Sequence, residues 1–153
     1  MARVITAPEM FPDKHPEWSV FLAGAIDMGA AVDWQTWVIE RLADHANIVL
    51  FNPRRVAFTP DTLDEQIRWE LEALEHVDTV FMWFPKDAKA PISFFESGLY
   101  WHSGKLLVGA ELGFYRRRNL ELTGARYGVI VHETLESMVF SLLHTMRSVG
   151  YLV

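Results

Sequence analysis

Short apolar runs alternate with amphipathic segments along most of the chain. The apolar runs are predicted to be buried strands, and they cover residues 18–24, 47–51, 77–84, 105–109 and 127–131. Between them, apolar residues recur every three or four positions, as they do on one face of a helix. This spacing predicts helices over residues 33–45, 61–76, 91–103 and 133–149. Strands that alternate with helices in this way indicate βαβ units and a parallel sheet.

The expected fold is α/β: a flavodoxin-like, doubly wound parallel sheet of five strands in the order 2-1-3-4-5, with helices on both faces. Residues 1–17 contain three prolines and little periodicity, so we interpret them as an N-terminal arm on the surface. Within the arm, Val4-Ile5-Thr6 could pair with an edge of the sheet. Residues 18–153 are expected to form a single domain.

The helix predicted over residues 61–76 has an apolar stripe made of Leu63, Ile67, Leu71 and Leu74. At about 100° per residue, Glu70 falls within roughly 55° of the centre of this stripe. A carboxylate on the buried side of a helix is unfavourable unless it is paired, hydrogen-bonded or used in chemistry. Glu70 is therefore either a site residue or a carboxylate at the edge of the stripe that reaches water.

A second carboxylate of interest, Glu96, lies near the start of the helix that follows the third strand. Ser93-x-x-Glu96 has the spacing of a capping box, in which the two side chains bond each other's backbone amides. The same position, just past the carboxyl end of a buried strand, is where ligands bind in open α/β sheets. Spacing alone leaves both interpretations open.

Other carboxylates also follow predicted strands. Asp27 lies in the loop 24–29 after the first strand, and Asp87 follows the third strand. The glycines of the loop, at its two ends, would let the backbone approach a ligand. Because the first and third strands are neighbours in the expected order, Asp27 and Glu96 should open onto one crevice. Paired carboxylates in a cleft are typical of glycosyl transfer, and a solvated pair of surface acids is the alternative.

Composition excludes several classes of protein. The net charge of −6 argues against binding to a nucleic acid polymer, and the absence of cysteine excludes disulfides and thiolate chemistry. No apolar run is long enough to span a membrane and the N-terminus lacks the pattern of a signal peptide, so a soluble, cytoplasmic protein is expected. The six histidines show no ligand-like spacing, and the common phosphate-binding and serine-hydrolase motifs are missing. We expect neither a metal site nor a cofactor.

Three motifs occur in a fixed order along the chain: Phe21-Leu22-Ala23-Gly24-Ala25-Ile26-Asp27, then Trp69-Glu70 placed eight residues before Asp78, then Phe95-Glu96-Ser97-Gly98. In this order and spacing the chain resembles the nucleoside 2-deoxyribosyltransferase superfamily, particularly its short bacterial and phage-like branch. The likeness extends over about residues 18–131. It implies that Glu96 is the nucleophile, that Glu70 contributes to base binding or proton transfer, and that Phe21 helps to hold the nucleophile.

The chain departs from the family pattern at several positions. Phe21 stands where the family enzymes often have tyrosine, and Ala90 stands where an acid usually precedes the nucleophile, which leaves Asp87 as a loose substitute. Ala25 replaces a serine that related nucleotide hydrolases use for phosphate. The residues expected to bind substrate are Phe21, Gly24, Ala25, Ile26, Arg54, Asp87, Ser93 and Ser97.

Two groups of arginines have no assigned role. Arg54-Arg55 follows the second strand, and Arg116-Arg117-Arg118 lies in a polar loop expected over residues 110–126. Both groups could be solvated loop charge. Alternatively, Arg54 or Arg55 could bind a phosphate or orient a carboxylate by a bidentate contact, which would favour a nucleotide over a nucleoside.

The resemblance implies an enzyme that cleaves the N-glycosidic bond of a 2-deoxynucleoside through a covalent glycosyl-glutamate at Glu96. Glu70 or Asp27 would assist the departing base, and the deoxyribosyl group would pass to another base or to water. The alternatives are a nucleotide N-glycohydrolase that acts on a (deoxy)nucleoside monophosphate, and a non-catalytic nucleotide-binding domain of the same fold. The expected partners are a nucleoside or nucleotide and a free nucleobase. The aromatic content and the resemblance also suggest a homo-oligomer, in which a neighbouring subunit could complete the site.

Overall fold

The computed structural model describes residues 1–27, 30–57 and 59–152. Met28 and Gly29, which end the loop expected to approach a ligand, lie outside the described residues. The strands are β1 (Arg3–Thr6), β2 (Trp18–Gly24), β3 (Ile48–Asn52), β4 (Thr79–Phe84), β5 (Leu106–Ala110) and β6 (Val131–His132). The helices are α1 (Trp34–Leu42), the 3-10 helix η2 (Pro60–Thr62), α2 (Leu63–His76), α3 (Pro91–Tyr100), α4 (Arg117–Tyr127) and α5 (Leu135–Ser148).

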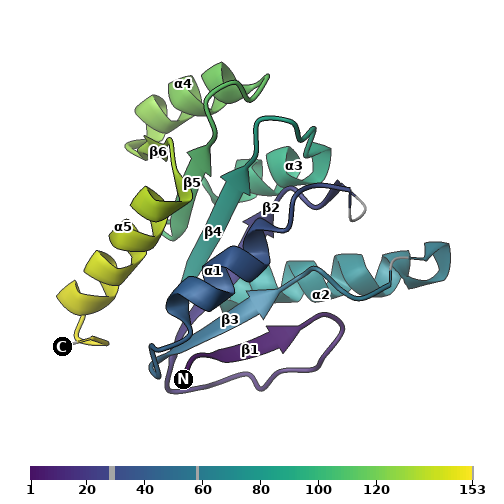
Figure 1. Cartoon of the computed structure of the whole chain (residues 1–153), viewed down its shortest axis with the longest axis vertical. Helices are drawn as coiled ribbons and strands as arrows, with labels where there is room; N and C mark the ends of the chain where they lie inside the picture. The colour runs from purple at the N-terminus through teal and green to yellow at the C-terminus, as the bar shows by residue number, and fades with distance from the viewer. Residues whose placement is uncertain (28–29, 58, 153) are drawn as a thin grey trace.

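The strands form one parallel sheet of six strands in the order β1-β3-β2-β4-β5-β6 (Figure 1). The expected sheet of five strands in the order 2-1-3-4-5 is therefore wrong, because the N-terminal arm contributes β1 as an additional edge strand beside β3. β1 contains the β-branched residues Val4, Ile5 and Thr6, which suit a pleated surface, and it buries Ile5 in the core. β2 and β4, the first and third of the expected strands, are neighbours as predicted.

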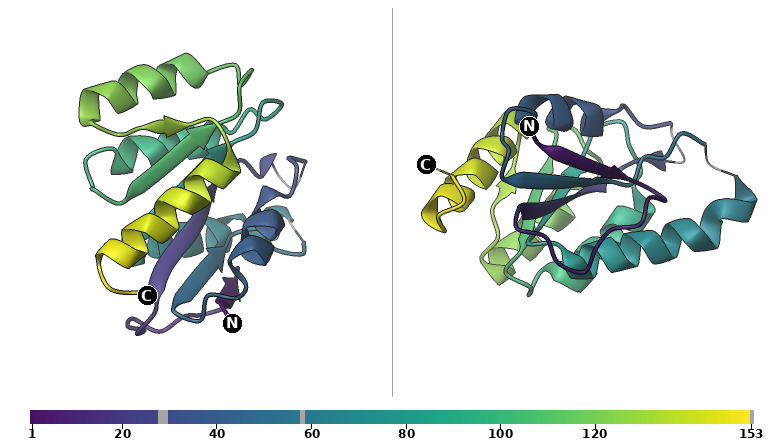
Figure 2. Two further views of the ribbon diagram at one scale, coloured as in Figure 1. Left: turned by 60° about the vertical axis from the view of Figure 1, so that its left-hand side comes forward. Right: turned by 90° about the horizontal axis from the view of Figure 1, so that it is seen from below.

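The sheet lies between two layers of helices (Figure 1, Figure 2). One apolar core joins the sheet to α1 and α5, and the other joins it to α2, α3 and α4. All six residues of the central strand β4 are buried, as its continuous apolar sequence predicts for a strand covered on both faces. The α/β class with helices on both faces is thus confirmed. Among the described residues, no helix combines the length and apolarity needed to cross a bilayer.

The chain after β5 differs from the expectation of a long loop and a fifth strand over residues 127–131. Helix α4 occupies most of this segment and ends at Tyr127, and Gly128 stops it in the left-handed conformation with a φ of 71°. Only Val131 and His132 pair with β5. Helix α4 packs closely against the segment that follows it. A Cβ at Gly124 would lie only 2.4 Å from the carbonyl oxygen of Val129, so this position requires glycine.

Helix α2 turns a different face to the core from the one predicted. Leu63, Ile67 and Leu71 of the expected stripe are 51%, 45% and 39% exposed. Trp69, the largest side chain of the helix, faces inward and donates from Nε1 to the carbonyl oxygen of Glu9 in the arm, at 2.8 Å. The buried positions of α2 are Gln66, Trp69, Ala73 and Leu74.

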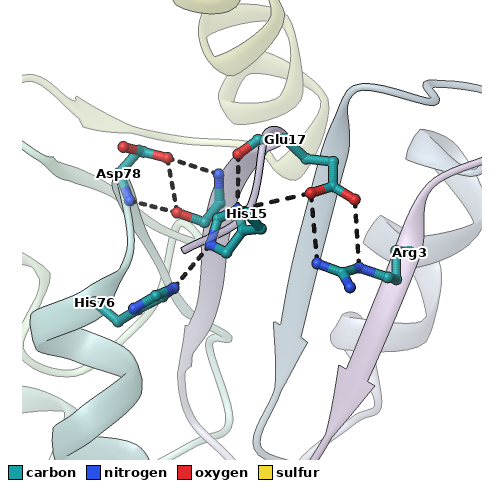
Figure 3. Close-up of polar contacts among 6 residues, drawn as sticks. Arg3, His15, Glu17, His76 and Asp78 are labelled. Atoms are coloured by element: carbon teal, nitrogen blue, oxygen red, sulfur yellow. Dashed lines mark hydrogen bonds and ion pairs between the residues drawn. The ribbon is translucent and has the colours of Figure 1, made fainter. Parts of the chain in front are cut away.

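The N-terminal arm is fastened to the sheet and to the end of α2 (Figure 3). The Nε2 atoms of His15 and His76 are 2.8 Å apart, and His15 Nδ1 donates to the carbonyl oxygen of Glu17 at 2.9 Å. Glu17 also pairs with Arg3 of β1 at 3.4 Å. Beside them, the carboxylate of Asp78 accepts from the Ser19 amide and hydroxyl, at 2.8 and 2.7 Å. These contacts fix the last turn of α2 at the amino ends of β2 and β4.

Candidate active site

A cavity of about 520 Å³ opens at the carboxyl ends of β2, β3 and β4, between the start of α3 and the first half of α2. Its size suits a small molecule, and its place is the usual ligand-binding crevice of a parallel sheet. Seven of the residues predicted for the site line it: Phe21, Gly24, Ile26, Asp27, Glu70, Ser93 and Glu96. A second cavity of about 590 Å³ lies at the opposite edge of the sheet, but Asp78 is the one carboxylate that the described residues place there.

Glu96 is a buried carboxyl group, with 6% of its surface exposed. The predicted capping box with Ser93 is not formed. Helix α3 begins at Pro91, directly after Ala90 in the left-handed conformation with a φ of 51°, so Ser93 is the third helical residue and Glu96 the sixth. Burial and the negative charge of Glu70 raise the pKa of Glu96 to about 8.

Glu70 projects from α2 into the same cavity and is partly buried. Its Oε1 accepts a hydrogen bond from Gln66 Nε2 at 2.8 Å. Burial raises the pKa of Glu70, while the hydrogen bond from Gln66 and the charge of Arg55 act in the opposite direction. The two carboxyl groups thus share one poorly solvated cavity, where a single proton between them relieves their repulsion.

Asp27 ties two loops together at the mouth of the cavity. Its carboxylate accepts from the backbone amides of Lys89 and Ala90, both at 3.0 Å. Its own φ is 49°, a conformation that aspartate tolerates better than most residues. Ala90 is the residue that precedes the first turn of α3, so the carboxylate of Asp27 lies beside the N-terminus of this helix. Its negative charge is favourable there.

The end of β2 shapes the floor of the cavity. Phe21 is 1% exposed, and its ring lies 6.0 Å from that of Trp69 in an edge-on arrangement. Gly24 has a φ of +121°, and a Cβ there would lie 2.3 Å from the carbonyl oxygen of Trp83. Only glycine lets β2 lie this close to β4 in this conformation.

Four of the predicted substrate-binding residues do not line the cavity: Ala25, Arg54, Asp87 and Ser97. The side chain of Ala25 is buried and its carbonyl oxygen accepts from Trp34 Nε1 at 3.0 Å. Asp87 is exposed, and the hydroxyl of Ser97 donates to the carbonyl oxygen of Phe94 in its own helix, at 2.7 Å.

Both arginines after β3 are bound within the protein. Arg54 Nε donates to Gln35 Oε1 at 3.1 Å and lies 3.3 Å from Asp33 Oδ1. Arg55 is buried, with Nε 2.7 Å from Gln66 Oε1 and a terminal nitrogen 2.9 Å from Glu65. Neither guanidinium is solvated loop charge, and neither lines the cavity.

Sequence reasoning missed Gln66, which lines the cavity and contacts Glu70 directly. The signal that could have found it is its spacing, because residues four apart on a helix are neighbours and Gln–acid pairs at this spacing interact. No such signal predicts the contact of Arg55 with Gln66 or its effect on Glu70, since both depend on where the segment after β3 passes α2.

The arrangement suits nucleophilic chemistry on a small, largely uncharged molecule. One carboxyl group of the pair can be ionised while the other carries a proton, so that the site holds a nucleophile and an acid at once. The other lining residues are mainly apolar, and none of the lining residues that the structure describes is a lysine or an arginine. Such a lining holds a ring by contact and leaves its polar edges to a few groups.

The chain matches one protein family, described as nucleoside 2-deoxyribosyltransferase like, over residues 17–114. This range contains β2 to β5 and all three carboxylates of the cavity. Among curated proteins, no sequence matches the chain. Because the match covers well over half of the sequence, the chain belongs to the nucleoside 2-deoxyribosyltransferase-like family.

Proposed function

We propose that this protein cleaves the N-glycosidic bond of a 2-deoxynucleoside and transfers the deoxyribosyl group to another nucleobase or to water. The observation that carries the proposal is the pair Glu96 and Glu70 in one cavity at the carboxyl edge of the sheet. Membership of the family supports a reaction of this kind. Glu96 is the nucleophile and Glu70 the acid and base.

The reaction proceeds in two displacements. In the free protein the proton of the pair lies on Glu96, whose pKa is about 8. When it passes to Glu70, the Glu96 carboxylate attacks the anomeric carbon, the bond to the base nitrogen breaks, and the base takes the proton from Glu70. A second base or a water molecule then attacks the same carbon, gives its proton to Glu70, and releases the Glu96 carboxylate. Two displacements retain the configuration of the sugar.

The substrate is a nucleoside rather than a nucleoside monophosphate. The cavity lining holds no arginine or lysine among the described residues, and Arg54 and Arg55 are engaged elsewhere. The carboxylate of Asp27 accepts from the amides of Lys89 and Ala90 just before α3, so a negative charge already lies beside the N-terminus of this helix. A phosphate would therefore enter a cavity that already contains acidic groups, without a positive charge to balance it.

Glu96→Ala should abolish both base exchange and hydrolysis. The assay offers deoxynucleosides or the corresponding monophosphates as substrates, with and without a second free base, and separates the products by chromatography. Glu72→Gln, a change on the exposed face of α2, is the control and should turn over like the wild type. Mass spectrometry should find one deoxyribosyl group on the Glu96 peptide during turnover. If Glu96→Ala turns over at the wild-type rate, Glu96 is not the nucleophile.

The same assay separates the alternatives. Free sugar as the only product, or a preference for the monophosphate, would identify a hydrolase or a nucleotide enzyme instead of a deoxynucleoside transferase. Ligand binding without turnover would favour a non-catalytic nucleotide-binding domain. The cytoplasmic location expected from the sequence stays a prediction.

We also propose that the protein is a homo-oligomer whose neighbouring copy covers an exposed apolar face of α2 and α3. This face consists of Leu63, Ile67, Leu71, Ile92, Phe95 and Leu99. Leu63, Ile67 and Ile92 also line the cavity, so a second copy seated here borders the site. Large apolar side chains that are exposed in such number on two helices are typical of an interface. Sedimentation should show an assembly that the double change Ile67→Lys and Phe95→Lys dissociates, and a wild-type monomer would contradict the proposal.

A further inference from the structure

Hydrogen bonds join three polar side chains from two separate segments in a row that ends at Glu70. Arg55, in the segment after β3, donates from Nε to Gln66 Oε1 at 2.7 Å. Gln66, on α2, donates from Nε2 to Glu70 Oε1 and to the carbonyl oxygen of Pro53, both at 2.8 Å. Arg55 and Gln66 are buried, at 7% and 6% exposure, so these bonds are sheltered from water.

The direction of this chain is fixed by chemistry. A guanidinium has donors only, so the oxygen of the Gln66 amide must face Arg55 and its nitrogen must face Glu70. Both hydrogens of the amide are then used, one on Glu70 and one on Pro53. Arg55 is itself held from the other side by Glu65 at 2.9 Å. Gln66 therefore cannot turn over and offer its oxygen to Glu70.

The two carboxyl groups of the cavity are unequal as a result. Burial raises the pKa of Glu70, but the hydrogen bond donated by Gln66 and the charge of Arg55 oppose this rise and favour the ionised form. Glu96 receives no such hydrogen bond from the residues that the structure describes, and burial together with the negative charge of Glu70 raises its pKa to about 8. Among the described residues, the titratable and charged groups that act on Glu70 or share its cavity are Arg55 after β3, Glu96 on α3 and Asp27 after β2.

We propose that Gln66, oriented by Arg55, is a positioning residue that keeps Glu70 ionised and thereby places the proton of the Glu70–Glu96 pair on Glu96 in the free protein. Because Oε1 of Glu70 is held by Gln66, Oε2 is the atom that takes the proton from Glu96 and later gives it to the leaving base. The catalytic meaning of this arrangement rests on the proposed function, whereas the position of the proton does not.

The test is a carbon-13 NMR titration of the two glutamate carboxyl groups, assigned with Glu70→Gln and Glu96→Gln. Gln66→Met should raise the titration midpoint of Glu70 by roughly one to two pH units, the worth of a hydrogen bond to a charged group. The midpoint of Glu96 should fall, because its neighbour is then less often ionised. In kinetics, the same variant should shift the pH profile of kcat/KM.

The chain supplies a matched control on the other side of the sheet. Gln35 is fully buried and accepts from Arg54 at 3.1 Å, but it does not line the cavity. Gln35→Met should therefore leave both midpoints unchanged. It also removes a buried hydrogen bond from an arginine, although it should cost less stability than Gln66→Met because Gln35 Nε2 has no hydrogen-bond partner among the described residues. If Gln66→Met fails to fold, Gln66→Glu replaces it, since its carboxylate still accepts from Arg55 while the donors to Glu70 and to Pro53 are lost. The added negative charge also raises the Glu70 midpoint, so in this variant an unchanged midpoint is the decisive result, and it counts against the positioning role.

An unchanged Glu70 midpoint in a folded Gln66 variant, or an equal shift in Gln35→Met, would overturn the positioning role. The NMR readout needs no turnover, so it is independent of the reaction. A shifted midpoint in a protein that turns over no deoxynucleoside would support the role of Gln66 and refute the proposed function.

Discussion

Replacing Glu96 by glutamine should remove most of the dependence of stability on pH between about pH 4.5 and pH 8. The perturbation is small in shape, because glutamine resembles a protonated glutamate. In the wild type, burial and the neighbouring Glu70 raise the pKa of Glu96 from 4.5 to about 8. In this window the folded protein holds a proton that the unfolded chain has released.

The size of the effect follows from the pKa. The free energy of unfolding falls as the pH rises wherever the folded state binds more protons. At 1.36 kcal/mol per pKa unit, the stability present below pH 4.5 decreases by about 5 kcal/mol once the pH has passed 8. Glutamine does not ionise, so the variant avoids this loss. It should exceed the wild type by up to about 5 kcal/mol at pH 9 and lie within about 1 kcal/mol of it at pH 5.

Urea denaturation at pH 5, 7 and 9, followed by tryptophan fluorescence, measures these free energies directly. Glu72→Gln serves as the control, because Glu72 is exposed on the same helix as Glu70. The free energy of unfolding of this variant should follow that of the wild type at all three pH values. If the free energies of unfolding of the wild type and of Glu96→Gln differ by the same amount at all three pH values, the buried carboxyl group of Glu96 does not hold a proton in this range. That result would refute the raised pKa of Glu96.

Three other changes test neighbouring parts of the structure. Glu70→Gln removes a negative charge beside Glu96, so the Glu96 midpoint should fall yet stay above 4.5 because burial remains, as NMR titration would show. Asp27→Asn tolerates the same backbone conformation, but one of the amides of Lys89 and Ala90 then faces a side-chain NH2 group instead of an acceptor, which should cost about 1–3 kcal/mol in denaturation experiments. Gly24→Ala forces a Cβ to 2.3 Å from the carbonyl of Trp83, so the melting temperature or the folded yield should drop sharply, and a variant that melts like the wild type would contradict the close approach.

Periodicity was sufficient to predict the main elements and the place of the site. The apolar runs at 18–24 and 77–84 are the neighbouring strands β2 and β4. Since parallel strands end at the same edge of a sheet, the carboxylates that follow them meet in one cavity, as Asp27 and Glu96 do. This step depends on local pattern and on general rules of topology, both of which a sequence contains.

The face of α2 could not be predicted in the same way. The helix carries apolar side chains on more than one side, and the choice between them depends on Trp69 meeting the N-terminal arm. The capping box predicted for Ser93 and Glu96 was wrong for a related reason. It required α3 to begin after Ser93, whereas the turn at Ala90 and Pro91 starts the helix earlier.

The sequence by itself determined the alternation of strands and helices, the carboxylates Glu96, Glu70 and Asp27, and the family. Only the tertiary structure decided what each carboxylate can do. Asp27 connects two loops because the loop after β4 brings the amides of residues 89 and 90 within hydrogen-bond distance of its carboxylate. Glu96 became the proton-holding member of the pair because it is buried beside Glu70, to which Gln66 donates a hydrogen bond. Proton affinity depends on solvation and on partners from distant segments, and those are properties of the folded chain.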